Sequence, residues 1–371
     1  MKCLLSLKQD QHGAGETVKF HWDPTGRYLV SCGANRRVHI WTRGGNKVHE
    51  IALRGSGSCL DIQWDRDGET VAILQEKHPE VVLYNVHTAE QQILGIGDGM
   101  KEPTFMAWSN LGPQLAIGSA KGNLLIYDKQ TKTKNPVWGK HSKAIICGCW
   151  GKRQNILALG SNDNTFTISN EKGETEEQLK VRAKPIRAIF ASIHTSSLSS
   201  KSDFLVLNIE GKTLYVYNWE TRARQMELKF KKSYGDLCRL ETYGNSFIFV
   251  GFKNGKVVSL STDEKEVGEE VQNWGALETP LTTFSSTHSL NRLATVMGPT
   301  VHLVDLQDIY RWNEEEKDKI EFGYELGRPA EVAWTSDGQI LTVSTDDGCV
   351  LSYLSSIPVL SATNGIFVAY L

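Results

Sequence analysis

The sequence predicts an all-β fold, a β-propeller in which repeated four-stranded units close into a ring. A strand–turn–strand pattern recurs along the whole chain, and most units end their first strand on a large residue. These end positions are 40 to 52 residues apart, which is the length of one propeller blade. The turns are rich in Asp, Gly and Pro, as in Asp23–Gly26.

Eight units follow one another along the chain. Their strongest segments are residues 18–41, 60–84, 105–128, 146–169, 186–218, 237–260, 281–305 and 332–353. Their first strands are expected to end at Trp22, Trp64, Trp108, Trp150, Phe190, Thr242, Ser285 and Trp334. Insertions at 192–202 and 313–319 explain the longest spacings. Units six and seven lack a large end residue, so eight blades are favoured and a seven-bladed ring stays an alternative.

One face of each first strand is apolar. In the first unit, Val18, Phe20 and Trp22 alternate with Lys19 and His21. A single four-stranded sheet cannot bury such a face, whereas stacked blades bury it between them. Weaker fourth strands follow, most clearly at 47–53 and 224–230.

The two ends of the repeat array are expected to join. The eighth unit has no obvious fourth strand, while Met1–Leu7 is strand-like and has no preceding partner. The N-terminal strand is therefore predicted to complete the last blade and remove an exposed edge. Residues 1–360 are expected to form this single propeller, and residues 361–371 a tail that begins a linker to a second propeller.

Composition excludes several other classes. The 371 residues include 41 basic and 43 acidic side chains, a net charge of −2 that gives no general attraction to nucleic acid. The seven cysteines include no Cys-x-x-Cys pair and fit reduced, buried side chains in a cytoplasmic protein. No signal peptide or long apolar run occurs.

Apparent ligand motifs are better explained as blade turns. Gly211-Lys212-Thr213 resembles the end of a phosphate loop, but Val206 stands where that motif needs glycine, and a strand follows. The acidic turn 65–69 is too short for a calcium loop. His141 is expected to join Ser161 and Asp163 in a structural network rather than in catalysis. No cofactor or metal is predicted.

One rim of the ring is the candidate partner-binding surface. It is made by the loops that lead into first strands and by the turns between second and third strands. In blades three to six these segments carry the basic residues Lys121, Lys143, Arg182, Lys184, Arg187, Lys212, Lys232, Lys253 and Lys256. Such a sector could steer an acidic partner, and a merely solvated rim is the alternative.

Several segments go beyond generic blade residues. Gly122–Trp150, Asp98–Gly112, Val332–Thr345 and Phe367–Leu371 closely resemble the N-terminal propeller of a WD-repeat subunit of intraflagellar transport complex A. The resemblance implies a larger protein with two propellers and a helical solenoid, so that this chain would be a fragment. It also implies a location in the cilium and basal body, and a role in retrograde transport and cargo entry.

The same resemblance suggests partners. They would be other subunits of complex A, cargo adaptors or ciliary membrane-protein cargo, with possible peripheral membrane association through the assembled complex and no nucleic acid. The function predicted is therefore a non-catalytic protein-binding platform. The alternatives are a propeller of a vesicle-coat or ubiquitin-ligase adaptor and, less favoured, an enzyme on a propeller scaffold.

Overall fold

A computed structural model describes residues 1–100, 102–193, 202–244, 247–263, 265–274, 279–306, 318–355, 361–364 and 367–370. Most of the two insertions expected at 192–202 and 313–319 therefore lies outside the described residues.

Strand alternation produces each blade in the same way. In the third blade, Met106 and Trp108 on β10 (Pro103–Trp108) are buried, and Trp108 pairs with Leu115 of β11 (Gln114–Ser119). Nearly all of β11 is buried because it lies inside the sheet and is covered on both faces by neighbouring blades.

The described strands form eight four-stranded antiparallel sheets, each numbered from the inner to the outer strand. Blades one to three comprise β2 (Lys19–Trp22), β3 (Tyr28–Cys32), β4 (Arg37–Thr42), β5 (Lys47–Ala52); β6 (Cys59–Trp64), β7 (Thr70–Gln75), β8 (Glu80–Asn85), β9 (Gln91–Gly95); and β10, β11, β12 (Leu124–Asp128), β13 (Lys134–Val137). Blades four and five comprise β14 (Ile145–Trp150), β15 (Leu157–Ser161), β16 (Thr165–Ser169), β17 (Thr175–Lys180); and β18 (Pro185–Ile193), β19 (Ser202–Ile209), β20 (Thr213–Asn218), β21 (Ala223–Lys229).

Blades six and seven comprise β22 (Leu237–Tyr243), β23 (Phe247–Phe252), β24 (Val257–Ser261), β25 (Glu270–Trp274); and β26 (Leu281–Thr287), β27 (Arg292–Met297), β28 (Thr300–Asp305), β29 (Asp318–Glu321). Blade eight comprises β30 (Pro329–Trp334), β31 (Ile340–Thr345), β32 (Val350–Leu354) and β1 (Lys2–Leu7). The short helical segments are α1 (Gln9–His12) and the 3-10 turns η1 (Asp98–Met100), η2 (Lys232–Tyr234) and η3 (Tyr324–Leu326). A separate hairpin pairs β33 (Ser361–Asn364) with β34 (Phe367–Tyr370), within the predicted tail.

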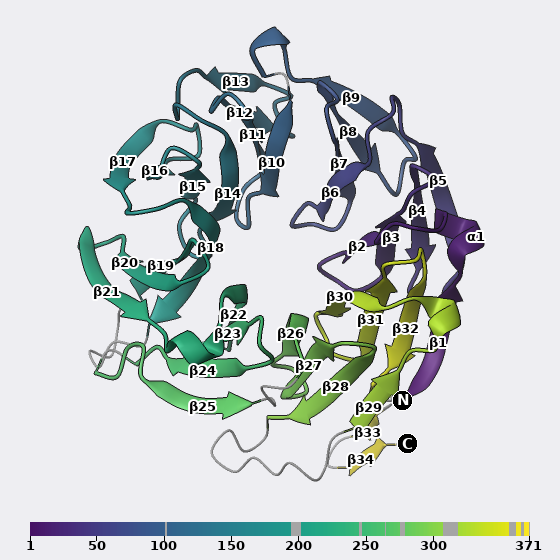
Figure 1. Ribbon diagram of the computed structural model, residues 1–371. Helices are drawn as coiled ribbons and strands as arrows, with labels where there is room; N and C mark the ends of the chain where they lie inside the picture. Colours follow the sequence, from purple (N-terminus) through teal and green to yellow (C-terminus); the bar gives the residue numbers. More distant parts are fainter. Residues whose placement is uncertain are drawn as a thin grey trace.

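The prediction of an eight-bladed propeller is confirmed. Figure 1 shows the blades arranged around a central axis, with the first strand of each blade innermost. Ring closure by the N-terminal strand is also confirmed, because β1 pairs antiparallel with β32, with Leu7 opposite Val350 and Lys2 opposite Leu354. Leu5 and Leu7 are buried in the apolar cluster that joins blades eight and one.

Polar side chains strengthen this closing seam. The indole N–H of Trp22 donates to Thr342 Oγ1 at 2.9 Å, and Lys19 Nζ lies 2.5 Å from Glu331 Oε1. Arg43 Nη2 lies 2.7 Å from Asp337 Oδ2. The seam between the two chain-distant blades is therefore held by burial, hydrogen bonds and ion pairs together.

The hydrophobic core is divided among the gaps between blades. Within the described residues, eight apolar clusters are present, and each joins two neighbouring blades. The cluster between blades two and three, for example, brings Leu74 against Trp108. Stability therefore depends on blade-to-blade contacts in sequence around the ring.

One predicted strand end is off by a residue. Each first strand reaches the buried first position of its second strand, as Trp108 does opposite Leu115. In blade seven the residue opposite the corresponding Leu293 is Ser286, not Ser285. Two adjacent serines replace the large end residue there, so the sequence pattern could not fix the register.

Histidines just before two first strands anchor side-chain networks. His12 Nε2 lies 2.8 Å from Ser31 Oγ, which also accepts a hydrogen bond from Trp41 Nε1 at 2.9 Å. Burial and the neighbouring His39 lower the pKa of His12 to about 4. This first-blade network was not predicted, although His12 precedes Trp22 by nearly the spacing that separates His141 from Trp150.

The network predicted at His141 is present with different hydroxyl partners. His141 Nδ1 lies 2.9 Å from Thr165 Oγ1 and Nε2 lies 3.0 Å from Thr167 Oγ1. Asp163 Oδ1 accepts from Thr165 Oγ1 at 2.6 Å, and its Oδ2 lies 3.4 Å from His141 Nδ1. Ser161 bonds instead to the carbonyl of Lys143, at 3.0 Å, so it does not contact the histidine directly.

Candidate functional site, a basic groove on one rim

Backbone hydrogen bonds make the predicted rim continuous. The N–H of Glu210 donates to the carbonyl of Lys184 at 3.0 Å within blade five. The N–H of Leu237 then donates to the carbonyl of Gly211 at 2.6 Å, joining blade six to blade five. Side chains on these loops are therefore presented from a fixed backbone rather than from free loop tips.

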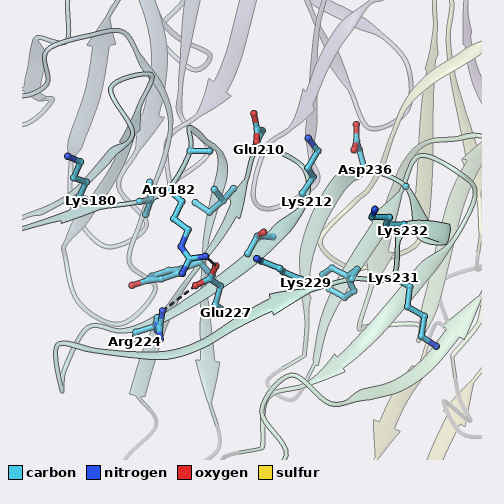
Figure 2. A pocket seen from close by; sticks show the side chains of 17 residues that line it. Lys180, Arg182, Glu210, Lys212, Arg224, Glu227, Lys229, Lys231, Lys232 and Asp236 are labelled. Atoms are coloured by element: carbon cyan, nitrogen blue, oxygen red, sulfur yellow. Dashed lines mark hydrogen bonds and ion pairs between the residues drawn. The ribbon is translucent and has the colours of Figure 1, made fainter.

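A groove of about 780 Å³ lies on this rim at blades four to six. Figure 2 shows its charged residues, with cations along both sides of blade five. We call it the basic groove and define it by its charged lining residues: Lys180, Arg182, Lys212, Arg224, Lys229, Lys231, Lys232, Glu210, Glu227 and Asp236.

Four local structures supply these side chains. Lys180 ends the outer strand β17, and Arg182 lies in the loop that leads from it into β18. Lys212 follows Glu210 and Gly211, which both adopt positive φ (53° and 72°) in the tight turn between β19 and β20. Because glycine tolerates this conformation, the turn can project Lys212 beyond the sheet. The outer strand β21 and the segment after it supply the others.

The groove carries a net positive charge. Seven of its lining residues are cations and three are carboxylates, a difference of four. Glu227 is shared by two arginines, with Oε2 at 3.2 Å from Arg224 Nη1 and Oε1 at 3.7 Å from Arg182 Nη1. In the described part of the chain, none of the lysines of the groove forms an ion pair. These lysines are therefore the cations available to an external anion.

Apolar and aromatic side chains form the rest of the groove. Tyr215, Val181, Ile209 and Phe230 line it beside the charges. Burial raises the pKa of Tyr215, so its hydroxyl stays neutral. A ligand in this groove would meet cations at its edges and apolar surface at its base, the combination found where proteins bind charged peptides.

The predicted basic residues fall into three groups. Arg182, Lys212 and Lys232 line the basic groove. Lys121, Lys143, Lys184, Lys253 and Lys256 lie on loops of the same rim but outside the groove; Lys256 sits over the Tyr234 ring at 4.3 Å. Arg187 lies on β18 itself and lines a second cavity on the central axis.

Lys180, Arg224, Lys229 and Lys231 were missed by the sequence analysis. They lie on or beside the outer strands β17 and β21, whose weak alternation gives no sign of what they face. A run of basic residues from Lys229 to Lys232 was the available signal.

The described residues include no group of three or more His, Cys, Asp and Glu side chains placed to hold a metal ion. No helix in the described part of the chain is long and apolar enough to span a membrane.

Comparison with known proteins places this propeller. A family model described as WDR19 first beta-propeller matches residues 18–348. The chain belongs to the WDR19 first beta-propeller family. This family is one of WD-repeat propellers, which typically act as non-catalytic scaffolds.

Curated relatives of this WDR19-type propeller are much longer proteins. WD repeat-containing protein 19 of Homo sapiens is 35% identical over 380 residues, which cover 100% of this chain and 27% of the relative. WD repeat-containing protein dyf-2 of Caenorhabditis elegans is 25% identical, covering 98% of this chain and 26% of the relative. The chain thus spans about a quarter of the length of the relatives it matches. The crystal structure of Saccharomyces cerevisiae Sqt1 has the same fold, with a TM-score of 0.74 at 13% identity over 95% of this chain and 98% of that one.

Proposed function

We propose that this propeller is a protein-binding module of a scaffold of the intraflagellar transport complex A type, and that its basic groove binds an acidic segment of a partner. The partner would be another complex A subunit or a cargo adaptor, and the setting would be the cilium and basal body during retrograde transport and cargo entry. The family match favours this role over that of a vesicle-coat or ubiquitin-ligase adaptor.

The observation that carries the proposal is the uncompensated charge of the groove on a rigid rim. The protein as a whole has a net charge of −2, yet the groove concentrates four excess positive charges. Local charge of one sign speeds encounter with a partner of opposite sign and rejects partners of like sign.

An exposed aromatic on the same rim supports protein binding. Trp138 follows β13 in the loop that leads into blade four, and 57% of it is exposed. The next residue, Gly139, donates its N–H to Asn123 Oδ1 at 2.9 Å, which fixes the loop beside the turn that carries Lys121. Tryptophan is enriched among residues that dominate protein interfaces.

Charge reversal in the groove tests the proposal. The triple variant Lys180→Glu, Lys212→Glu, Lys229→Glu should reduce recovery of copurifying complex A subunits or cargo adaptors from ciliated cells, and the remaining binding should depend less on salt. The matched control Lys121→Glu, Lys143→Glu, Lys253→Glu changes the same charge on the same rim outside the groove. Undiminished recovery with the groove variant, or an equal loss with both, would overturn the assignment.

A further inference from the structure

A second cavity lies on the central axis, away from the rim groove. It has a volume of about 530 Å³ and is surrounded by residues of the inner strands of blades two to seven. The charged residues that line it are Lys152, Arg187 and Glu241, and Arg239 adjoins Glu241 on the same strand.

The carboxylate in this cavity is already neutralised. Glu241 Oε1 accepts from Arg239 Nη2 at 2.9 Å. Its Oε2 accepts from the backbone N–H of Ser286 at 2.9 Å and from the Ser286 hydroxyl at 3.1 Å. Glu241 and Arg239 therefore form a satisfied pair that offers no charge to the other cations.

Arg187 has no such partner. Within the described residues its guanidinium forms neither an ion pair nor a hydrogen bond, although burial and the nearby Arg239 lower its pKa to about 10. It stays charged at neutral pH all the same. A largely buried cation without a counter-charge destabilises the protein, because desolvation is not offset by any pairing.

Lys152 supplies a second cation on the same wall. Its Nζ donates to Thr242 Oγ1 at 2.7 Å and forms no ion pair in the described part of the chain. The neighbouring amides have their donors occupied. Gln63 Nε2 donates to Asp61 Oδ2 at 2.7 Å, and Asn110 Nδ2 donates to the carbonyl of Trp150 at 3.0 Å. The unused donors of the cavity are therefore those of Arg187 and Lys152.

We propose that the central cavity binds a small molecule with at least two anionic groups, phosphate or carboxylate, one held by Arg187 and the other by Lys152. Arg187 would supply the planar fork that binds such groups through two parallel hydrogen bonds. The volume is that of a small-molecule site rather than of a single ion. Each anion would provide a partner for a cation that the chain itself leaves unpaired.

Calorimetric titration of the protein with fructose 1,6-bisphosphate and with citrate tests the proposal and separates the two anion chemistries. Uncharged fructose is the matched control ligand. Saturable binding of the bisphosphate or of citrate, without binding of fructose, is the expected result. The variants Arg187→Met and Lys152→Met should each weaken that binding by at least about tenfold, through loss of a charge-assisted pair.

Two further measurements distinguish this site from a structural cluster and from the rim. Without ligand, Arg187→Met should unfold at the same or a higher temperature than the parent, because it removes an unpaired buried charge. The rim variant Lys180→Met, Lys229→Met should bind the anion as the parent does. Absence of binding by both anions, a lower unfolding temperature of Arg187→Met, or equal binding by parent and Arg187→Met would overturn the inference.

Discussion

The indole N–H of Trp150 in blade four donates to the main-chain carbonyl of Ala107 in blade three at 3.0 Å. The same bond recurs where Trp64 donates to the carbonyl of His21 at 3.1 Å and where Trp334 donates to that of Ser285 at 3.0 Å. In each case the tryptophan at the end of a first strand bonds to the residue before the equivalent position in the preceding blade. Blade-to-blade stacking is thus fixed by a directed bond as well as by burial.

Trp108 provides a matched test of that bond, since its buried Nε1 has no acceptor among the described residues. Trp150→Phe should lower the free energy of unfolding by about 1 kcal/mol more than Trp108→Phe, because only the former loses a hydrogen bond. Urea unfolding of both variants measures the difference, and equal losses would count against the role of the bond. Trp108→Ala should lower the free energy of unfolding by roughly 3–5 kcal/mol through lost burial and a cavity.

Deleting residues 1–7 should open the ring. Without β1, the backbone of β32 becomes an unpaired edge that can recruit another chain, so we expect aggregation on size-exclusion chromatography. The double variant Leu5→Ala, Leu7→Ala keeps the backbone pairing and should remain monomeric with reduced thermal stability. A deletion variant that stays monodisperse and equally stable would show that β1 is dispensable for closure.

Acid should destabilise the protein partly through His12. Its pKa is about 4 in the folded chain and about 6.5 when unfolded, so only the unfolded state gains this proton between those values. Stability is therefore fully present above pH 6.5 and falls as the pH drops toward 4, by about 2 kcal/mol at pH 5. Urea unfolding at pH 7.5 and pH 5 should show a smaller pH effect in His12→Asn than in the parent, even if that variant is less stable throughout. Identical pH effects would rule out this contribution.

Glu227→Gln should increase the positive charge of the basic groove without altering its shape. The substitution removes the carboxylate that Arg182 and Arg224 share. If an acidic partner binds in the groove, its association should become faster and more dependent on salt. Stopped-flow or surface-plasmon kinetics at two ionic strengths would detect this, and unchanged kinetics would place the partner elsewhere.

Local patterning explains why the blades could be predicted and the groove only in part. Alternation in segments such as 18–22 and the turn at 23–26 are encoded within a few residues, so strand positions follow from them directly. Ser285 and Ser286 carry no such contrast, and the register there is set by pairing with Leu293. The groove requires knowing which outer-strand residues face each other across blades. Arg187 lies only three residues beyond Lys184, yet it belongs to the central cavity.

Closure by the first strand has a consequence for synthesis on the ribosome. In the chain, 343 residues separate Leu7 from its partner Val350, since 350 minus 7 is 343. At typical elongation rates of roughly 5–20 residues per second, the N-terminal segment waits for tens of seconds before that partner emerges. Earlier blades can stack as they are made, whereas the last blade depends on the oldest and the newest parts of the nascent polypeptide meeting. A prematurely terminated product would therefore carry an idle N-terminal strand at one end and an open blade at the other.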